Sequence, residues 1–319
     1  MAEPDLGRID ELLEAQERKF RRAFLLYVQL IQSNAVMARV MEHLEARDFN
    51  GAFRILESYI AQMADVLPRI QQEVGGATAA ELAAALPEIA VAVSFDASHP
   101  RAAALVRTQR LGLIQQFSQS QLRAVQQAVN RGVGTGMGAQ ATAREFRSAV
   151  GLTDTQEAYV ASYRRLLETR SRDALERALR DRRFDDRLRQ AIEDERPLTQ
   201  RQVNMMVDRY RARAIMARAE TIARSEAHRA FSEAREESLE QMAEQTGIAR
   251  ERIRRVWHAT DDKRTRDHHA SMDGQERAMD EPFVDGLGNR LRYPGDPDAP
   301  ANTVVNCRCP LTFRVLQAA

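Results

Sequence analysis

Cysteine is almost absent from this chain. Its 319 residues include only two cysteines, Cys307 and Cys309, which stand two positions apart near the C-terminus. Two cysteines are too few for the disulfide framework of a small secreted domain. A disulfide between residues two apart is strained, and a reducing cytosol would open it. The pair therefore needs another explanation.

Long apolar runs and a strong net charge are also lacking. No stretch approaches the ~20 apolar residues that span a bilayer. Residues 1–19 lack the apolar core of a signal peptide. We therefore expect an intracellular, soluble protein that does not enter a membrane. The formal net charge is +1, so no overall field draws the chain to nucleic acid.

Lysine is scarce, whereas arginine is abundant. Lysine occurs only at Lys19 and Lys263, and the other 45 of the 47 basic residues are arginine. The coding bias of the source genome explains such a ratio. Bidentate recognition of phosphate or carboxylate groups by the guanidinium of arginine also explains it. The composition alone leaves both explanations open.

The few aromatic residues, 6% of the chain, contrast with frequent Ala, Leu, Arg, Glu and Gln. This composition predicts a mainly α fold: a long-helix N-terminal body followed by a small α+β, loop-rich C-terminal module. Residues 8–48 predict one amphipathic helix or a helix pair. A second helix is expected over residues 52–73, and Gly75-Gly76 is expected to break it.

Capping residues predict where further helices begin. Thr78 with Glu81 and Thr153 with Gln156 both have the spacing of a capping box. The longest helix is expected to begin after Thr199 and to end at Gly247.

The glycine-rich segment RGVGTGMG, residues 131–138, is predicted to be a linker. A dinucleotide-binding turn would need a preceding strand, and the sequence before this segment predicts a helix. We therefore divide the chain into four parts. They are a helical domain of unassigned role over residues 1–130, the linker over 131–138, a helical region over 139–247 and the α+β module over 248–319. In that module, strands are expected at about residues 252–259 and after Cys309.

Histidine and aspartate gather in the module that holds the two cysteines. His258, His268 and His269 fall within twelve residues, and four aspartates lie among them or shortly after. If NCRC is a strand, alternation places both thiols on one face, where they can bind one soft metal ion. A structural metal would help a small loop-rich module to fold. Two other interpretations stay open: a catalytic metal, and no metal, with the histidines and arginines bonded to loop backbone.

Arg264 and Arg266 stand two residues apart among acidic residues. They are suited to internal salt bridges with the loop aspartates. They are equally suited to the carboxylates or phosphates of a partner.

The C-terminal motifs follow one another in a specific order. They are W-x-A-x-D-D-x-R-T-R-x-x-H-x-x-M-D-G-Q, then PF, then Y-P-G-D-P and N-C-R-C. In this order and spacing the chain resembles the phage Mu F-like head-morphogenesis family, whose members are also called minor head or minor capsid proteins. The resemblance covers about residues 200–316, and it includes the helix upstream of these motifs, where the family often has a Thr/Ser-Glu pair, here Ser225-Glu226. Lys263 is a departure from the family's pattern.

The resemblance implies a virion component of a tailed phage or prophage. Such a protein would act at the portal vertex and procapsid, assist assembly, DNA packaging or DNA delivery, and be carried inside the head in few copies. Its implied partners are portal and procapsid proteins, with weak contact to packaged double-stranded DNA. It would occupy the bacterial host cytoplasm during assembly and the head interior afterwards. A structural role of this kind implies no enzyme activity and no catalytic residue.

The resemblance also implies site residues. Metal binding, with zinc as the structural ion, is implied for His269, Cys307 and Cys309, and Asp262 and His268 are further candidate ligands. The remaining motif residues are expected to bind a partner or to support the fold. They are Trp257, Arg264, Arg266, Asp273, Gly274, Asn306 and Arg308.

A metal-dependent hydrolase, such as a nuclease, is the alternative function. In that case His268, His269 and Asp262 would hold the metal, and an aspartate would act as general base on its bound water. Two cysteines close to the metal are more typical of a closed structural site. The sequence therefore favours an assembly protein over a hydrolase.

Overall fold

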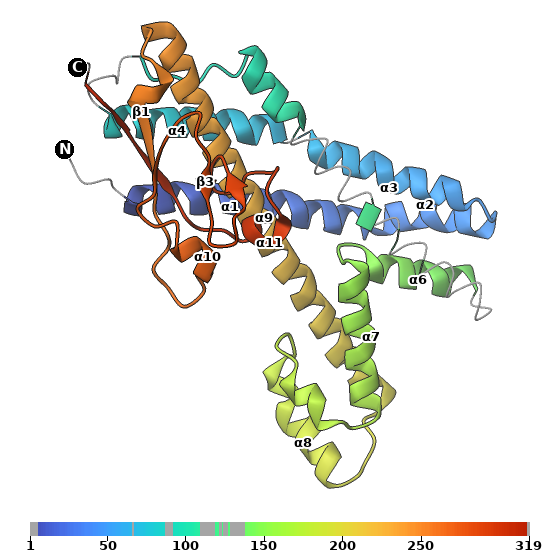
Figure 1. The fold of residues 1–319 in the computed structure, drawn as a ribbon. Helices are drawn as coiled ribbons and strands as arrows, with labels where there is room; N and C mark the ends of the chain where they lie inside the picture. Colours follow the sequence, from blue (N-terminus) through green and yellow to red (C-terminus); the bar gives the residue numbers. More distant parts are fainter. Residues whose placement is uncertain are drawn as a thin grey trace. The chain divides into compact units, whose positions relative to one another are not determined.

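A computed structural model describes residues 6–65, 67–86, 92–108, 119, 120, 123, 127 and 138–317. The described chain is mainly α-helical, with short strands only in its C-terminal module, as Figure 1 shows. The predicted fold class is thereby confirmed. Of the predicted linker over residues 131–138, only Gly138 is among the described residues.

The N-terminal part contains a pair of helices followed by two more. Ser33 caps the second helix, because its hydroxyl accepts a hydrogen bond from the Val36 amide at 3.4 Å. This cap separates two helices where the sequence predicted one helix or a pair. The four helices are α1 (Leu6–Ile31), α2 (Asn34–Glu45), α3 (Phe49–Ala64) and α4 (Leu67–Ala85).

The break predicted at Gly75-Gly76 is wrong, because both glycines lie inside α4. A Cβ atom added to Gly75 would lie 2.1 Å from the ring of Phe95, so glycine is needed there for close packing. The predicted capping box at Thr78 is also wrong. The Thr78 hydroxyl donates to the Gly75 carbonyl inside the helix, and Glu81 pairs with Arg235 of a distant helix. Tertiary contacts, rather than local propensity, thus explain these residues.

The second helical region confirms two predicted boundaries. At Thr153 the capping box is complete, since Thr153 and Gln156 each accept a hydrogen bond from the other's backbone amide. The longest helix ends just before Gly247, whose φ of +69° suits glycine. The helices are α6 (Ala139–Ala149), α7 (Asp154–Glu168), α8 (Asp185–Glu193) and α9 (Gln200–Thr246).

The chain forms two compact units, each assembled from separate stretches of sequence. One unit comprises Met1–Ala23, Ala64–Gly112 and Glu220–Ala319, and the other comprises Phe24–Met63 and Leu113–Ala219. The first unit therefore joins N-terminal residues to the C-terminal module. The four-part division in sequence order stays a prediction.

The unit that contains α7 and α8 has its own core. Tyr163 of α7 stacks on Tyr210 of α9, with ring centroids 4.4 Å apart. Leucine and valine side chains from α7, α8 and the N-terminal part of α9 surround this pair. This packing holds three helices and the 3-10 turns between them together.

The C-terminal module is built on a three-stranded antiparallel sheet. Its order is β2-β1-β5, and a separate hairpin pairs β3 with β4. The strands predicted near residues 252–259 and after Cys309 are thereby confirmed. The elements are β1 (Ile253–Trp257), α10 (Asp267–Ala270), β2 (Glu276–Ala278), β3 (Phe283–Val284), β4 (Arg290–Leu291), α11 (Ala301–Val304) and β5 (Leu311–Val315).

Two helices cover this sheet. Leu82 of α4 and Leu239 and Met242 of α9 pack with Ile253 of β1 in one buried cluster. In Figure 1, β1 lies beside the C-terminal half of α9. The module therefore completes its core with helices that lie far from it in sequence.

None of the described helices is, by itself, both long enough and apolar enough to be a candidate membrane span. The bent pair formed by α1 and α2 meets the length and composition criteria only when the two are taken together.

Candidate metal centre

The NCRC segment begins in a turn at Asn306 and belongs to no strand, so the prediction of a strand at the cysteines is wrong. Asn306 has a φ of +59°, and residues 307–310 belong to no strand. The Cys307 amide donates a hydrogen bond to the Val304 carbonyl at 3.1 Å. Both cysteines are nevertheless buried, each with 2% of its surface exposed. The two thiols therefore lie in the loop between this turn and β5.

His269 of α10 completes a group of three buried donors. Its Nδ1 lies 3.6 Å from Cys307 Sγ and 3.5 Å from Cys309 Sγ. The three donor atoms all lie within 4.8 Å of one another. Zinc bonds of about 2.3 Å to sulfur and 2.0–2.1 Å to nitrogen place tetrahedral ligand atoms roughly 3.5–3.8 Å apart. The donors are therefore already spaced to hold one metal ion.

The two thiols influence each other's protonation. The hydrogen bond from Cys307, followed by those from His269 and the Thr260 amide, lowers the pKa of the Cys309 thiol to about 4. The same hydrogen bond, together with burial, raises the pKa of Cys307. One thiolate thus forms readily, and a metal ion would replace the remaining proton. Thiolate and imidazole are the donors of structural zinc sites.

Asp262 lies outside this group of donors. Its carboxylate forms a two-point ion pair with Arg308, at 2.5 and 2.7 Å. The Arg308 guanidinium, followed by the Arg264 amide, holds the pKa of Asp262 well below its usual range. The Arg264 side chain is mostly exposed and lies 3.7 Å from Asp262. Asp262 therefore anchors the arginine that stands between the two cysteines.

His268 also lies outside the group, although it adjoins His269. The two rings are perpendicular, with centroids 4.9 Å apart. The acidic residues near His268 are Asp285 and Asp267.

Arg266, which precedes α10, donates hydrogen bonds to the backbone carbonyls of Thr303 and Val305. Arg266 thus ties α10 to α11 through backbone groups rather than through the loop aspartates.

The other motif residues hold the loops around the donors. The Trp257 ring meets the His269 ring edge-on, with centroids 5.9 Å apart. The Asp273 carboxylate accepts a hydrogen bond from the Ala259 amide, and the Gly274 amide donates to the Trp257 carbonyl, both at 2.8 Å. Gly274 has a φ of +71°, which favours glycine. These contacts explain the presence of Trp257, Asp273 and Gly274 in the motif by their role in holding the loops of the module.

Two buried arginines escaped the sequence analysis. Arg235 of α9 pairs with Glu81 and donates to the Leu311 carbonyl, next to the cysteine turn. Arg255 of β1 is also buried, with Glu236 as its acidic partner. The sequence does contain a signal that Arg255 is buried. Side chains alternate along β1, so Arg255 lies on the same face as the apolar residues Ile253 and Trp257.

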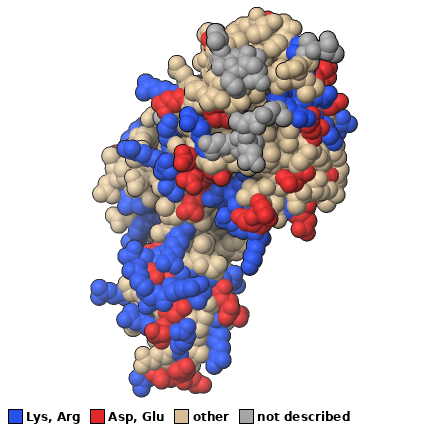
Figure 2. All heavy atoms as spheres, turned by 90° about the vertical axis from the view of Figure 1, so that its left-hand side faces the viewer, with Lys and Arg blue, Asp and Glu red and all other residues tan. Residues whose placement is uncertain are grey.

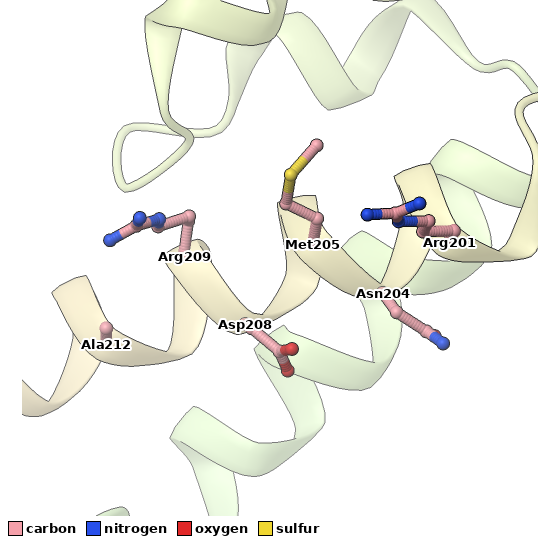
Figure 3. Close-up of a pocket in the computed structure, with 6 residues that line it drawn as sticks. All are labelled: Arg201, Asn204, Met205, Asp208, Arg209 and Ala212. Atoms are coloured by element: carbon pink, nitrogen blue, oxygen red, sulfur yellow. The ribbon is translucent and has the colours of Figure 1, made fainter.

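A hollow of about 740 Å³ lies on the unit that contains α7 and α8, along one face of the N-terminal part of α9. Figure 3 shows the six side chains that line it, all of them on this helix. Asn204 accepts hydrogen bonds from Arg164 and Gln200. Active sites usually bring together polar groups from several elements, whereas one helix lines this hollow. Its lining residues are Arg201, Asn204, Met205, Asp208, Arg209 and Ala212.

The geometry predicts that Asp262 is dispensable for metal binding. We expect Asp262→Asn to keep the metal content of the wild-type chain and to change thermal stability only slightly, because its ion pair is partly exposed. His269→Gln, measured in parallel, is expected to lower the metal content. Elemental analysis of both purified variants tests this. Loss of metal in Asp262→Asn would instead make Asp262 a ligand.

Comparison with known proteins identifies the family. A family model described as phage Mu protein F like protein matches residues 123–312. Neither the curated proteins nor the solved structures contain a match to the chain. The matched range includes α9, α10 and both cysteines, and it spans more than half of the sequence. It also overlaps most of the region whose motifs suggested this relationship. The chain therefore belongs to the phage Mu protein F-like family.

Proposed function

We propose that this protein is a minor head protein that acts at the portal vertex during head morphogenesis of a tailed phage or prophage. Membership of the phage Mu protein F-like family is the observation that supports this most strongly, since the family points to head morphogenesis. Portal and procapsid proteins are the proposed partners. The host cytoplasm and then the head interior are its proposed locations.

We further propose that the metal is zinc and that its role is structural. Both cysteines belong to the buried core of the module, together with Trp257, Phe283 and Leu311. A closed site with two thiolates and an imidazole suits zinc and leaves little access for a substrate. When bound, the ion would fix the NCRC turn against α10. The module would then present a rigid surface to a partner.

Contact with packaged DNA is proposed to be weak. Figure 2 shows basic and acidic residues side by side on the visible face. Several arginines in this protein are paired with acids, such as Arg183 with Asp181 and Arg189 with Asp186. Such pairing reduces the charge available to phosphates. Whatever DNA binding occurs is therefore expected to fall steeply with salt concentration.

The hydrolase alternative is not favoured by the geometry of the site. Asp262, one of its three proposed ligands, is engaged by Arg308. The three donors that do converge are buried and include both cysteines. A catalytic metal needs an open coordination position for water or substrate.

Particle fractionation tests the proposed role. DNA-free procapsids and mature virions are purified after induction of the encoding phage or prophage. The protein is then quantified by mass spectrometry relative to the portal protein. We expect it in both particle types, in few copies, and we expect fewer infectious particles after deletion of its gene. Its absence from both particle types would contradict the proposal.

A further inference from the structure

A second histidine is buried beside the cysteine turn. His228 of α9 has 3% of its surface exposed. Neither of its ring nitrogens has a hydrogen-bond partner among the residues that the structure describes. Buried polar groups are nearly always partnered. This imidazole therefore needs an explanation beyond packing.

The face of α9 that holds His228 is fastened to the cysteine turn. The Asn306 amide donates to Ser225 Oγ at 3.1 Å, and Arg224 donates to the Asn306 side-chain oxygen at 3.2 Å. His228 lies one helical turn after Arg224, on the same face. It lines a small enclosed cavity with Pro310 and Leu311, the residues directly after Cys309.

The surroundings of the His228 ring combine a cysteine sulfur with backbone oxygens. Cys309 is the acidic group that interacts electrostatically with this imidazole. The carbonyl groups of Pro294 and Arg308 also lie beside the ring, although their geometry does not make hydrogen bonds. A metal-bound histidine usually donates its second ring N–H to such an oxygen. The ring thus lies near both a cysteine and carbonyl groups of this kind.

We propose that His228 is the fourth protein ligand of the metal centre. This inference rests on the metal site proposed above, where His269, Cys307 and Cys309 leave tetrahedral zinc one ligand short. His228 is outside the group whose donor atoms lie within 4.8 Å of one another. Metal binding would therefore draw its ring toward the other three. The completed Cys2His2 site would join α9 to the loops of the module.

Other nearby donors fit this position less well. His258 Nε2 lies 2.7 Å from the Thr312 hydroxyl, and Asp262 is held by Arg308. His268 has a buried Nε2 without a partner among the described residues. Its charged neighbours, however, are His269, Asp285, Arg266 and Asp267, and no cysteine is among them. His268 is therefore the matched control for His228.

X-ray absorption at the zinc edge tests the proposal on the full chain loaded with one equivalent of zinc. The spectrum distinguishes sulfur from lighter ligands and counts imidazole rings. We expect two sulfurs and two imidazoles in the wild-type chain. His228→Gln is expected to lower the imidazole count from two to one, whereas His268→Gln is expected to leave it at two. A wild-type centre with a single imidazole, or an unchanged count in His228→Gln, would overturn the assignment.

The outcomes separate this inference from the proposal on which it rests. A wild-type chain that binds no zinc contradicts the metal site itself, and with it the fourth ligand. A chain that binds zinc with one imidazole contradicts only His228. If His228→Gln fails to fold, the wild-type imidazole count decides alone. His228→Cys adds a second readout, because a ligand at this position would raise the sulfur count from two to three.

Discussion

The double variant Cys307→Ser/Cys309→Ser is expected to lose its bound metal and to unfold the C-terminal module. A ligand present at 100 to 1,000 times its Kd stabilises the folded state by about 2.7–4.1 kcal/mol. The variant loses that stabilisation. It also places two hydroxyl groups in a core that contains Trp257 and Leu311, at a cost of roughly 1–3 kcal/mol each. Together these losses are comparable with the total stability of a typical domain, about 5–15 kcal/mol.

Metal analysis and fluorescence measure this result together. Trp257 is the only tryptophan in the chain and is fully buried beside His269, so its emission reports unfolding of the module. We expect about one zinc per wild-type chain and none in the variant, with a red-shifted emission. A zinc chelator should produce the same shift in the wild-type chain.

An alanine pair separates metal loss from the burial of hydroxyl groups. Cys307→Ala/Cys309→Ala removes both ligands without adding a polar atom to the core, and it is expected to lose zinc and to be destabilised as well. The structural-metal proposal would be contradicted if the wild-type chain purified without metal and the chelator caused no shift in its fluorescence emission. The two cysteines would then act only as core residues.

Arg255→Met is expected to destabilise the module by about 3–5 kcal/mol. Arg255 is 1% exposed on β1 and donates to the carbonyls of Ala278, Arg292 and Glu281. It also pairs with Glu236 at 3.3 Å. Methionine fills a similar volume but leaves that carboxylate and those carbonyls without their donor. Breaking one side of a buried ion pair has this cost because an uncompensated charge stays buried.

The pH dependence of this variant provides an internal check. Burial raises the pKa of Glu236, and Arg255 opposes that shift. Without Arg255 the folded-state pKa of Glu236 should rise further above its unfolded value. Stability lost at neutral pH should then be partly recovered as the pH falls through the folded-state pKa, because the folded state takes up the proton. Urea denaturation of variant and wild type at pH 7 and pH 5 measures the difference.

Arg254→Met is the matched control for the neighbouring position. The Arg254 side chain is partly exposed on the opposite face of β1, and its ion pairs with Glu276 and Glu281 are both 3.9 Å long. Exposed pairs of this kind contribute less than about 1 kcal/mol. Similar losses in the two variants would show that Arg255 is not the anchor that its contacts indicate.

Local signals in the sequence predicted part of the structure well. Thr153 and Gln156 form the expected capping box, and α9 begins after Thr199 and ends before Gly247. Each of these features depends on residues within one helical turn. The motif order also indicates the correct family, because a family motif is itself a linear pattern. The three residues His269, Cys307 and Cys309 were named in the same way, and the structure places their donor atoms together.

The sequence by itself therefore determined the helical character, the family and the identity of three candidate ligands. Tertiary structure alone decided the features that depend on distant neighbours. Gly75 continues a helix because Phe95 packs against it, and NCRC begins in a turn fastened to Ser225 of α9. His228 lies beside that turn although about 80 residues separate them in sequence. Propensity and spacing describe the chain only over a few residues, whereas burial and metal geometry are set by segments that meet only in the folded protein.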